Sequence, residues 1–328
     1  MSNETVQTRL PGLKEVVQAW MYIRPFYVII TTFGGLTGNT LSIIVFIKYK
    51  SWRAAGIHFL FCLAISDSMN LILDVSSGLD LFGCSVNIFA IGHVTCVVLM
   101  ATWWFTWLLS GWVIVVFTIE RWFSINFAMK SATVDFVRFR KRALFTMIVV
   151  LLIICVPFLF MYTVREYGVP PNTFKKCNTA TTGVKFFYYW NQFVRLGCSY
   201  FTPALTVLVF NFLLIISIMR SRFEGGKHTK ESNRNKEINV ATSLMMISSL
   251  YIITTIPGSV VWTWHDYIEG RGYVGWSQSD IGDIVSLGYL CTALNSINFS
   301  TNFLIYATKF DFFLSTLSSV CLCWKKRQ

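Results

Sequence analysis

Seven long apolar segments separated by short polar stretches dominate the pattern of this chain. They run over Pro25–Ile47, Ile57–Phe82, Phe89–Ile119, Ala143–Val164, Phe186–Met219, Ile238–Trp264 and Ile281–Thr308. Each is long enough to cross the roughly 30 Å hydrocarbon core of a bilayer as a helix. The longest polar stretch, Arg220–Lys236, is too short to fold alone. The pattern therefore predicts an all-α membrane protein, a bundle of seven transmembrane helices.

Composition supports this interpretation, and charge adds an orientation. Hydrophobic residues make up 54% of the chain and charged residues 13%, and the mean hydropathy is +0.56. The polar stretches on one side of the predicted membrane carry 19 basic residues, against eight on the other side. Lys and Arg accumulate on the cytoplasmic side, so we expect residues 1–24 to be extracellular. Residues 25–308 then form the membrane domain, and 309–328 a cytoplasmic helix and tail. The net charge of +12 thus reflects topology, and we expect no nucleic-acid partner.

Both terminal regions carry candidate modification sites. Asn3 begins a glycosylation sequon on the predicted outer side. After the seventh segment, apolar residues at i, i+3, i+4 and i+7 predict a short amphipathic eighth helix on the inner membrane surface. These residues are Phe310, Phe313, Leu314 and Leu317. Cys321 and Cys323 lie beside a basic run near the carboxyl terminus and are candidates for palmitoylation.

Polar side chains within the apolar segments are costly in a membrane, which marks each as a candidate functional residue. Measured along their helices, Asn39, Asp67, Ser110 and Asn302 lie about 10–16 Å from the predicted cytosolic face. Asn298 shares a helix face with Asn302. We expect these groups to form a buried network around one carboxylate, with the oxygen ligands that a small cation prefers. The alternative is a protonated Asp67 that is only hydrogen-bonded.

The third segment has a cysteine at one end and an acid–arginine pair at the other. Glu120-Arg121-Trp122 closes the segment, and Cys96 lies 25 residues before the arginine, about 38 Å along a helix. The acid can hold the arginine locally at this end of the segment.

The seventh segment ends with Asn302-Phe303-Leu304-Ile305-Tyr306. This differs from the known motif Asn-Pro-x-x-Tyr in having Phe303 at the position of the proline. Together with the Cys and Glu-Arg-Trp positions, this arrangement resembles the rhodopsin-like (class A) G-protein-coupled receptors from Pro25 to Cys323. The Glu-Arg-Trp form and Phe303 are most similar to invertebrate neuropeptide receptors, including those of nematodes.

The resemblance implies several contacts. It favours a disulfide between Cys96 and Cys177 in the loop after the fourth segment, although position alone leaves Cys84 as a competing partner. It implies a sodium ion at Asp67, supported by Ser110, Asn298 and Asn302. It also implies a pair between Arg121 and Glu237, at the start of the sixth segment, that outward movement of this helix would break. A solvated Glu237 is the alternative.

The sequence departs from the family at two places that bear on activation. Thr255 stands where the family has a tryptophan in the sixth segment, and the fourth segment has no tryptophan. The resemblance also implies a heterotrimeric G protein as partner, with Glu120, Arg121, Glu237, Asn302 and Tyr306 in the switch, and arrestin as a further partner.

Residues near the outer end of the bundle suggest a ligand class. Asp74 lies on the Asp67 face of the second segment but nearer the outside, and Trp103, Thr106 and Trp107 share a face of the third. Arg195, in the outer half of the fifth segment, pairs either with a receptor acid or with a ligand. The aspartate that amine receptors carry is Trp103 here, and the retinal-binding lysine of opsins is Ser296.

We therefore predict a multi-pass receptor of the plasma membrane for an extracellular ligand, a short amidated neuropeptide. A chemosensory receptor for a small molecule is the alternative within the family, and a transporter is the alternative outside it. Enzyme motifs such as HExxH, GxSxG or a P-loop do not occur, so we expect no catalytic residues and no cofactor beyond the sodium ion.

Overall fold

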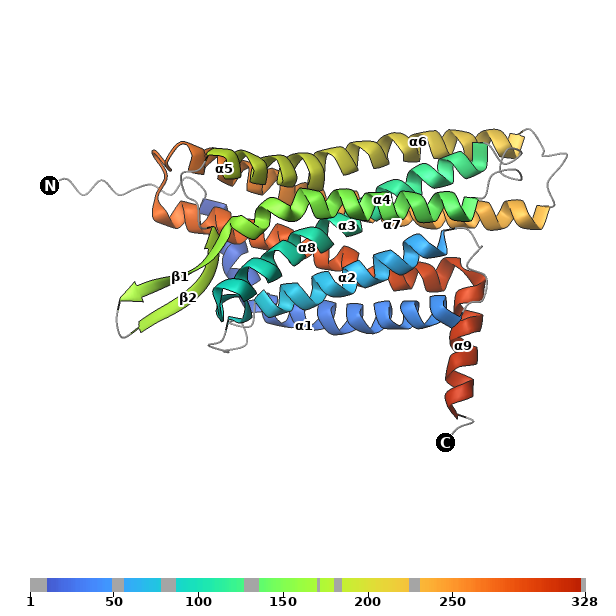
Figure 1. The fold of residues 1–328 in the computed structure, drawn as a ribbon, viewed down its shortest axis with the longest axis horizontal. Coiled ribbons are helices and arrows are strands. Elements are labelled where there is room, and N and C mark those ends of the chain that lie inside the picture. The colour runs from blue at the N-terminus through green and yellow to red at the C-terminus, as the bar shows by residue number, and fades with distance from the viewer. Residues whose placement is uncertain are drawn as a thin grey trace.

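The structure, a computed structural model, is a nearly all-helical, elongated bundle (Figure 1). It describes residues 11–48, 56–77, 87–126, 136–169, 172–179, 185–223 and 231–325. The long helices are α1 (Pro11–Lys48), α2 (Ile57–Ser77), α3 (His93–Asn126), α4 (Phe136–Cys155), α6 (Thr202–Phe223), α7 (Glu231–Gly270) and α8 (Gln278–Lys309). Among the described residues, six spans are long and apolar enough to cross a membrane. The remaining long helix, α8, packs against α7 and α1 within the bundle.

Shorter elements distinguish the two ends of the bundle. The antiparallel strands β1 (Tyr162–Val169) and β2 (Asn172–Thr179) project from one end, called the hairpin end below (Figure 1). The last helix, α9 (Asp311–Lys325), turns away from the opposite end, called the α9 end. Its buried Phe313 packs against Phe46 and Tyr306, so the helix predicted after the seventh segment is present and docked.

The helices differ most from the predicted segments at the start of the first and at the end of the fourth. α1 begins at Pro11 and passes through Pro25, because Val17 and Trp20 are already buried and Trp20 packs edge-to-face on Tyr27. The fourth helix does not continue to Val164. α4 ends at Cys155, a 3-10 turn η4 (Val156–Phe160) follows, and β1 begins at Tyr162. Pro157 lies at the start of this turn, where its missing N–H cannot continue the α-helical hydrogen bonds.

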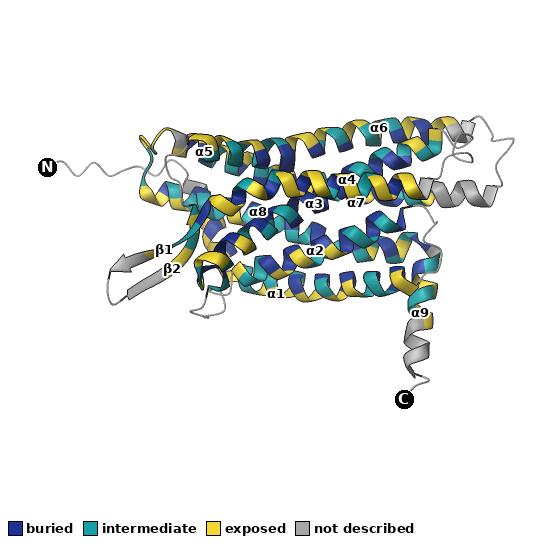
Figure 2. Cartoon of the chain, in the orientation of Figure 1, coloured by how far each residue is buried: buried dark blue, intermediate teal, exposed yellow. Residues whose placement is uncertain are grey.

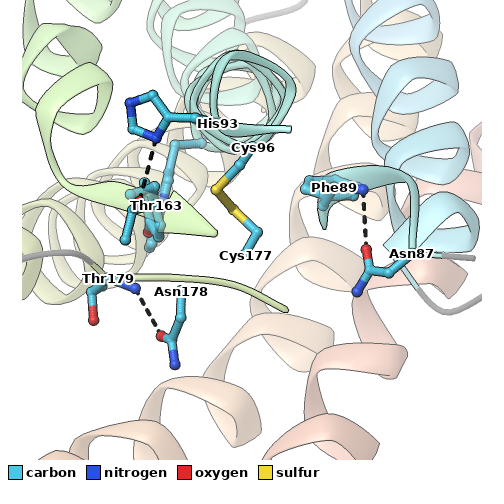
Figure 3. The surroundings of a disulfide bond; sticks show 10 residues. Asn87, Phe89, His93, Cys96, Thr163, Cys177, Asn178 and Thr179 are labelled. Atoms are coloured by element: carbon cyan, nitrogen blue, oxygen red, sulfur yellow. Dashed lines mark hydrogen bonds between the residues drawn. A yellow bond between two sulfur atoms is a disulfide. The ribbon is translucent and has the colours of Figure 1, made fainter. Parts of the chain in front are cut away.

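A disulfide joins the hairpin to the third helix. Cys96, at the start of α3, is bonded to Cys177 of β2, which is the pairing that the family resemblance implied (Figure 3). A second contact comes from deeper in α3, where the Trp104 indole N–H donates to the Tyr162 hydroxyl at 2.9 Å. Cys84, the competing partner, lies outside the described residues, after the end of α2. The hairpin is therefore fixed to α3 at two heights.

The third helix lies at the centre of the bundle and packs against α2, α4, α6 and α7. Buried residues line its length (Figure 2). Large apolar side chains of other helices, such as Phe26, Phe145 and Phe212, are exposed. This distribution suits a chain surrounded by lipid, because polar groups are satisfied inside and apolar groups face the hydrocarbon.

A π-helical segment shapes the hairpin end of the fifth span. The short helix α5 (Lys185–Gln192) leads into the π-helix η5 (Phe193–Phe201), which continues as α6. Its carbonyls accept side-chain hydrogen bonds from two neighbours, Cys198 O from the Trp112 indole and Ser199 O from the Tyr251 hydroxyl, both at 2.9 Å. The Tyr251 ring lies against Gly111, where a Cβ would be 2.8 Å from its hydroxyl oxygen. η5 is thereby tied to α3 and α7.

Candidate functional site

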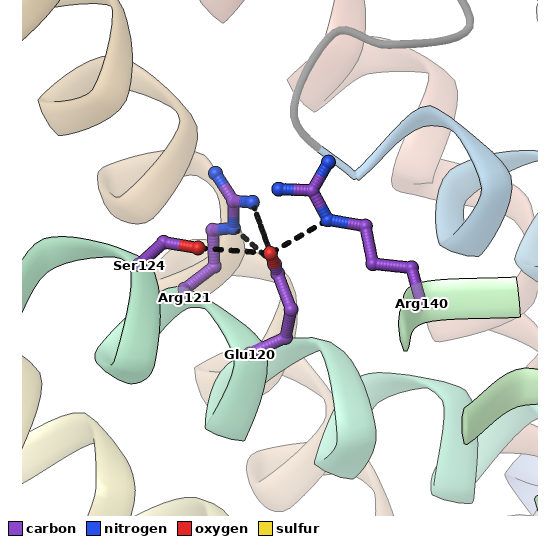
Figure 4. A network of polar contacts seen from close by, with 4 residues as sticks. All are labelled: Glu120, Arg121, Ser124 and Arg140. Atoms are coloured by element: carbon purple, nitrogen blue, oxygen red, sulfur yellow. Dashed lines mark hydrogen bonds and ion pairs between the residues drawn. The ribbon is translucent and has the colours of Figure 1, made fainter. Parts of the chain in front are cut away.

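A buried cluster around one carboxylate occupies the α9 end of α3. The fully buried Arg121 donates to both oxygens of Glu120, from Nε to Oε2 at 2.6 Å and from Nη2 to Oε1 at 2.7 Å (Figure 4). Ser124, one turn later, donates to Oε1 at 2.9 Å. Charge-assisted, bidentate bonds of this kind are among the strongest in proteins. The acid therefore holds the arginine locally, in the arrangement that the sequence suggested.

A second arginine shares the same carboxylate. Arg140 of α4 is buried, and its Nε donates to Glu120 Oε1 at 2.7 Å (Figure 4). Sequence reasoning missed this residue because it lies in the basic run Arg138–Arg142, which was attributed to topology as a whole. Within that run, Lys141 and Arg142 are exposed. Glu120 thus pairs with two buried cations, and the pair with Arg140 joins α3 to α4.

A polar network lies deeper in the bundle, around Asp67 of α2. Ser110 of α3 donates to Asp67 Oδ1 at 2.6 Å, and Asn302 of α8 donates to Oδ2 at 2.8 Å. Asn39 of α1 donates instead to the Phe299 carbonyl of α8 at 3.0 Å. Three of the four predicted helices therefore meet at Asp67, and α1 joins this layer through the α8 backbone.

Several buried polar atoms of this layer have no hydrogen-bond partner within the described residues. Asn298 is fully buried, and within the described residues neither atom of its side-chain amide has a hydrogen-bond partner. The same holds for Asn302 Oδ1, Asn39 Oδ1 and the Tyr306 hydroxyl. Buried polar groups in native proteins are nearly always satisfied by protein, water or an ion. The layer thus has the carboxylate and the free oxygens that a small cation needs.

At the hairpin end, the predicted ligand residues of α2 and α3 form an aromatic face around one acid. The Trp103 indole N–H donates to Asp74 Oδ1 at 2.9 Å. The Trp103 ring lies 5.5 Å from that of Trp107, which in turn packs edge-to-face on Phe299. Thr106 is fully buried and donates to Asn70 Oδ1 at 2.6 Å, so its hydroxyl joins α2 to α3.

Across the bundle, Arg195 of η5 pairs with a receptor acid. Asp266 of α7 accepts through Oδ2 from Arg195 and, at 2.8 Å, from the Gln192 amide. The two charged side chains are only 15% and 7% exposed. Arg195 also lies over the Trp262 ring, with Cζ 6.0 Å from the centroid, and its Nε is buried without a hydrogen-bond partner within the described chain. Of the two roles open for Arg195, the structure contains the pair with a receptor acid.

Comparison with known families decides the class of the protein. Residues 38–306 match the family described as "7 transmembrane receptor (rhodopsin family)". The chain belongs to this family. The match begins in the last turns of α1, covers α2 to α7, and ends shortly before the end of α8. The protein is therefore a multi-pass membrane receptor, and its family is not one of enzymes. Comparison with curated proteins found no match.

The position of the family's sixth-helix tryptophan has a different contact in this receptor. Thr255 of α7 is buried and donates to Asn295 Oδ1 of α8 at 2.9 Å. Two turns further, the Trp262 indole donates to the Thr292 hydroxyl at 2.9 Å. Polar contacts thus join α7 and α8 where the family has a large aromatic side chain.

Four predicted positions lie outside the described residues or have side chains that do. Asn3 lies before Pro11, and the side chains of Glu237, Cys321 and Cys323 are not described although their helices are. Glycosylation, palmitoylation and the Glu237 contact therefore stay predictions. At the α9 end the receptor has instead a described contact between Asn126 of α3 and Ser217 of α6, at 2.8 Å.

Proposed function

We propose that this receptor lies in the plasma membrane, binds a short amidated peptide at the hairpin end, and activates a heterotrimeric G protein at the α9 end. The observation that carries the proposal is the placement of partly buried charge near the hairpin end. Asp74 accepts a hydrogen bond from Trp103, and Arg195, paired with Asp266, lies over the Trp262 ring. An acid suits a cationic peptide side chain, and an arginine suits a backbone or amide carbonyl.

The proposed orientation places the hairpin end outside the cell. Disulfides persist in oxidising compartments, and Cys96–Cys177 lies at this end. The α9 end carries the basic stretches that favour the cytoplasmic side. This orientation leaves the hairpin end open to an extracellular ligand.

The proposed mechanism is a shift between two conformations. Ligand contacts with Asp74, Trp103 and Arg195 favour a state in which the α9 end of α7 moves outward and Arg121 leaves Glu120. Arg140 stays on Glu120 and keeps its carboxylate paired. Arg121 then faces the opened cleft, where the G protein binds and, after it, arrestin.

A peptide screen tests this function. Cells expressing the receptor with a promiscuous G protein are exposed to amidated peptides, and calcium is measured. We expect a saturable response that Arg121→Ala abolishes at equal surface expression, whereas Arg142→Ala, which removes an exposed arginine at the same end, preserves it. A response that survives Arg121→Ala would contradict the switch. A response to volatile molecules alone would favour a chemosensory receptor. Substrate uptake without nucleotide exchange on a G protein would favour a transporter.

We also propose that the resting receptor holds a sodium ion at Asp67, with Ser110, Asn298 and Asn302 as its neighbours. The unpartnered amide of Asn298 and the carboxylate of Asp67 support this assignment. Sodium requires the negative charge, whereas a protonated Asp67 would need only its hydrogen bonds.

Asp67→Asn is therefore expected to abolish the sodium dependence of both agonist affinity and thermal stability. The substitution keeps the size of the side chain but removes the charge and one of the two acceptor oxygens. The measurement is the Tm of the purified receptor in sodium chloride against choline chloride. Asp74→Asn, on the same helix face but bonded to Trp103, is the matched control and should keep the dependence. An equal dependence in Asp67→Asn and wild type would exclude the ion site.

A further inference from the structure

The last turns of α7, at the hairpin end, gather three potential metal ligands. One ligand atom from each of His265, Asp266 and Glu269 lies within 4.8 Å of the others. His265 and Glu269 are at i and i+4, so their side chains lie on the same face of the helix. Neither was singled out as a site residue from the sequence.

The spacing between His265 and Asp266 fits a shared ion. His265 Nδ1 is buried and makes no hydrogen bond within the described residues, yet it lies 3.5 Å from Asp266 Oδ1. Two ligand atoms that each lie about 2.0–2.1 Å from a tetrahedral zinc ion are about 3.4 Å apart. The two atoms are therefore at the separation that common ligands of one ion require.

The surroundings of Asp266 hold its carboxylate in place for this role. Gln192 and Arg195 both donate to Oδ2, which leaves Oδ1 toward His265. Partners that orient a ligand in this way are typical of metal sites. Two carboxylates against one arginine leave the cluster negative. In the adjoining turn, burial and then the charges of Glu269 and Asp266 raise the pKa of Tyr273.

We propose that His265, Asp266 and Glu269 form a binding site for a divalent transition-metal ion, Zn²⁺, with water completing the coordination. One imidazole and two carboxylates match the ligand types of open zinc sites, whereas Ca²⁺ and Mg²⁺ prefer more oxygen ligands and no imidazole. Glu269 is exposed, which gives the ion access from solvent. Because Asp266 also contacts Arg195, an ion at this site changes the charge beside Arg195.

Metal binding is measured on the purified, full-length receptor without any peptide, so the result is independent of the proposed function. ZnCl₂ is titrated in equilibrium dialysis, with Tm as a second readout and MgCl₂ and CaCl₂ as metal controls. We expect His265→Ala and Glu269→Gln each to weaken zinc binding by about tenfold or more. His93→Ala, which removes an exposed histidine at the same end, should leave it unchanged.

A gain-of-affinity variant makes the test independent of any folding defect. Glu269→His places two histidines at i and i+4, a zinc-binding arrangement, and is expected to tighten zinc binding by about tenfold. The proposal is overturned if wild type binds zinc no more tightly than magnesium. It is equally overturned if His265→Ala and Glu269→Gln bind zinc as wild type does, which would leave His265 only as an ion-pair partner of Asp266.

Discussion

Glu120→Gln is expected to destabilise the resting receptor by about 3–5 kcal/mol, because it removes a negative charge that two buried arginines share. Arg121 is fully buried and Arg140 nearly so, and both donate to the Glu120 carboxylate. The glutamine amide preserves size but offers one acceptor oxygen and no charge. A lower Tm of the purified receptor and a higher basal rate of nucleotide exchange on a G protein are the measurements.

The loss of stability in Glu120→Gln can be compared with the losses in two smaller changes to the same cluster. Arg140→Gln removes one charge-assisted hydrogen bond and leaves the bidentate Arg121 contact, so we expect a loss of about 1.5–3 kcal/mol. Ser124→Ala removes one neutral donor and should cost about 1 kcal/mol. Similar, small losses in all three variants would show that the carboxylate does not hold this end of the receptor together. An unchanged basal rate in Glu120→Gln would separate the cluster from the switch.

The parts of the fold that follow from local pattern were predictable from the sequence. Apolar runs longer than a bilayer crossing identify the helices without any tertiary information. Depth along a helix, counted from its charged end, placed Asp67, Ser110 and Asn302 in one layer, and their side chains are in contact. The Cys96–Cys177 pairing was implied by the family resemblance, since position alone left Cys84 open.

The features that sequence reasoning missed depend on tertiary packing. The sequence does not distinguish Arg140 from its basic neighbours. Only the packing of α4 against α3 shows that Arg140 is buried, whereas Lys141 and Arg142 are exposed. The hairpin replaces the end of an apolar run because Pro157 interrupts α4. The π-helix η5 has Trp112 and Tyr251, from two other helices, as donors to its carbonyls. Hydrophobic periodicity carries none of this information.

Arg195→Ala and Asp266→Ala are each expected to destabilise the receptor by about 3 kcal/mol, since each leaves a mostly buried charge without its partner. The exposed pair of Lys175 and Glu166 on the hairpin is the matched control. Its side chains are 59% and 63% exposed, with the charged atoms 3.2 Å apart. Exposed pairs contribute little, so Lys175→Ala should cost well under 1 kcal/mol. Tm and surface expression measure both effects.

A charge swap separates the structural role of this pair from a role in ligand binding. Arg195→Asp combined with Asp266→Arg keeps opposite charges across the same gap between η5 and α7, so it should recover part of the stability lost in the single variants. It also reverses the charge that a ligand carbonyl would meet at position 195. We therefore expect Tm and expression to recover while the peptide response stays lost. Recovery of the peptide response together with stability would show that the pair only supports the bundle, and that the ligand is held instead by Asp74 and the tryptophans of α3.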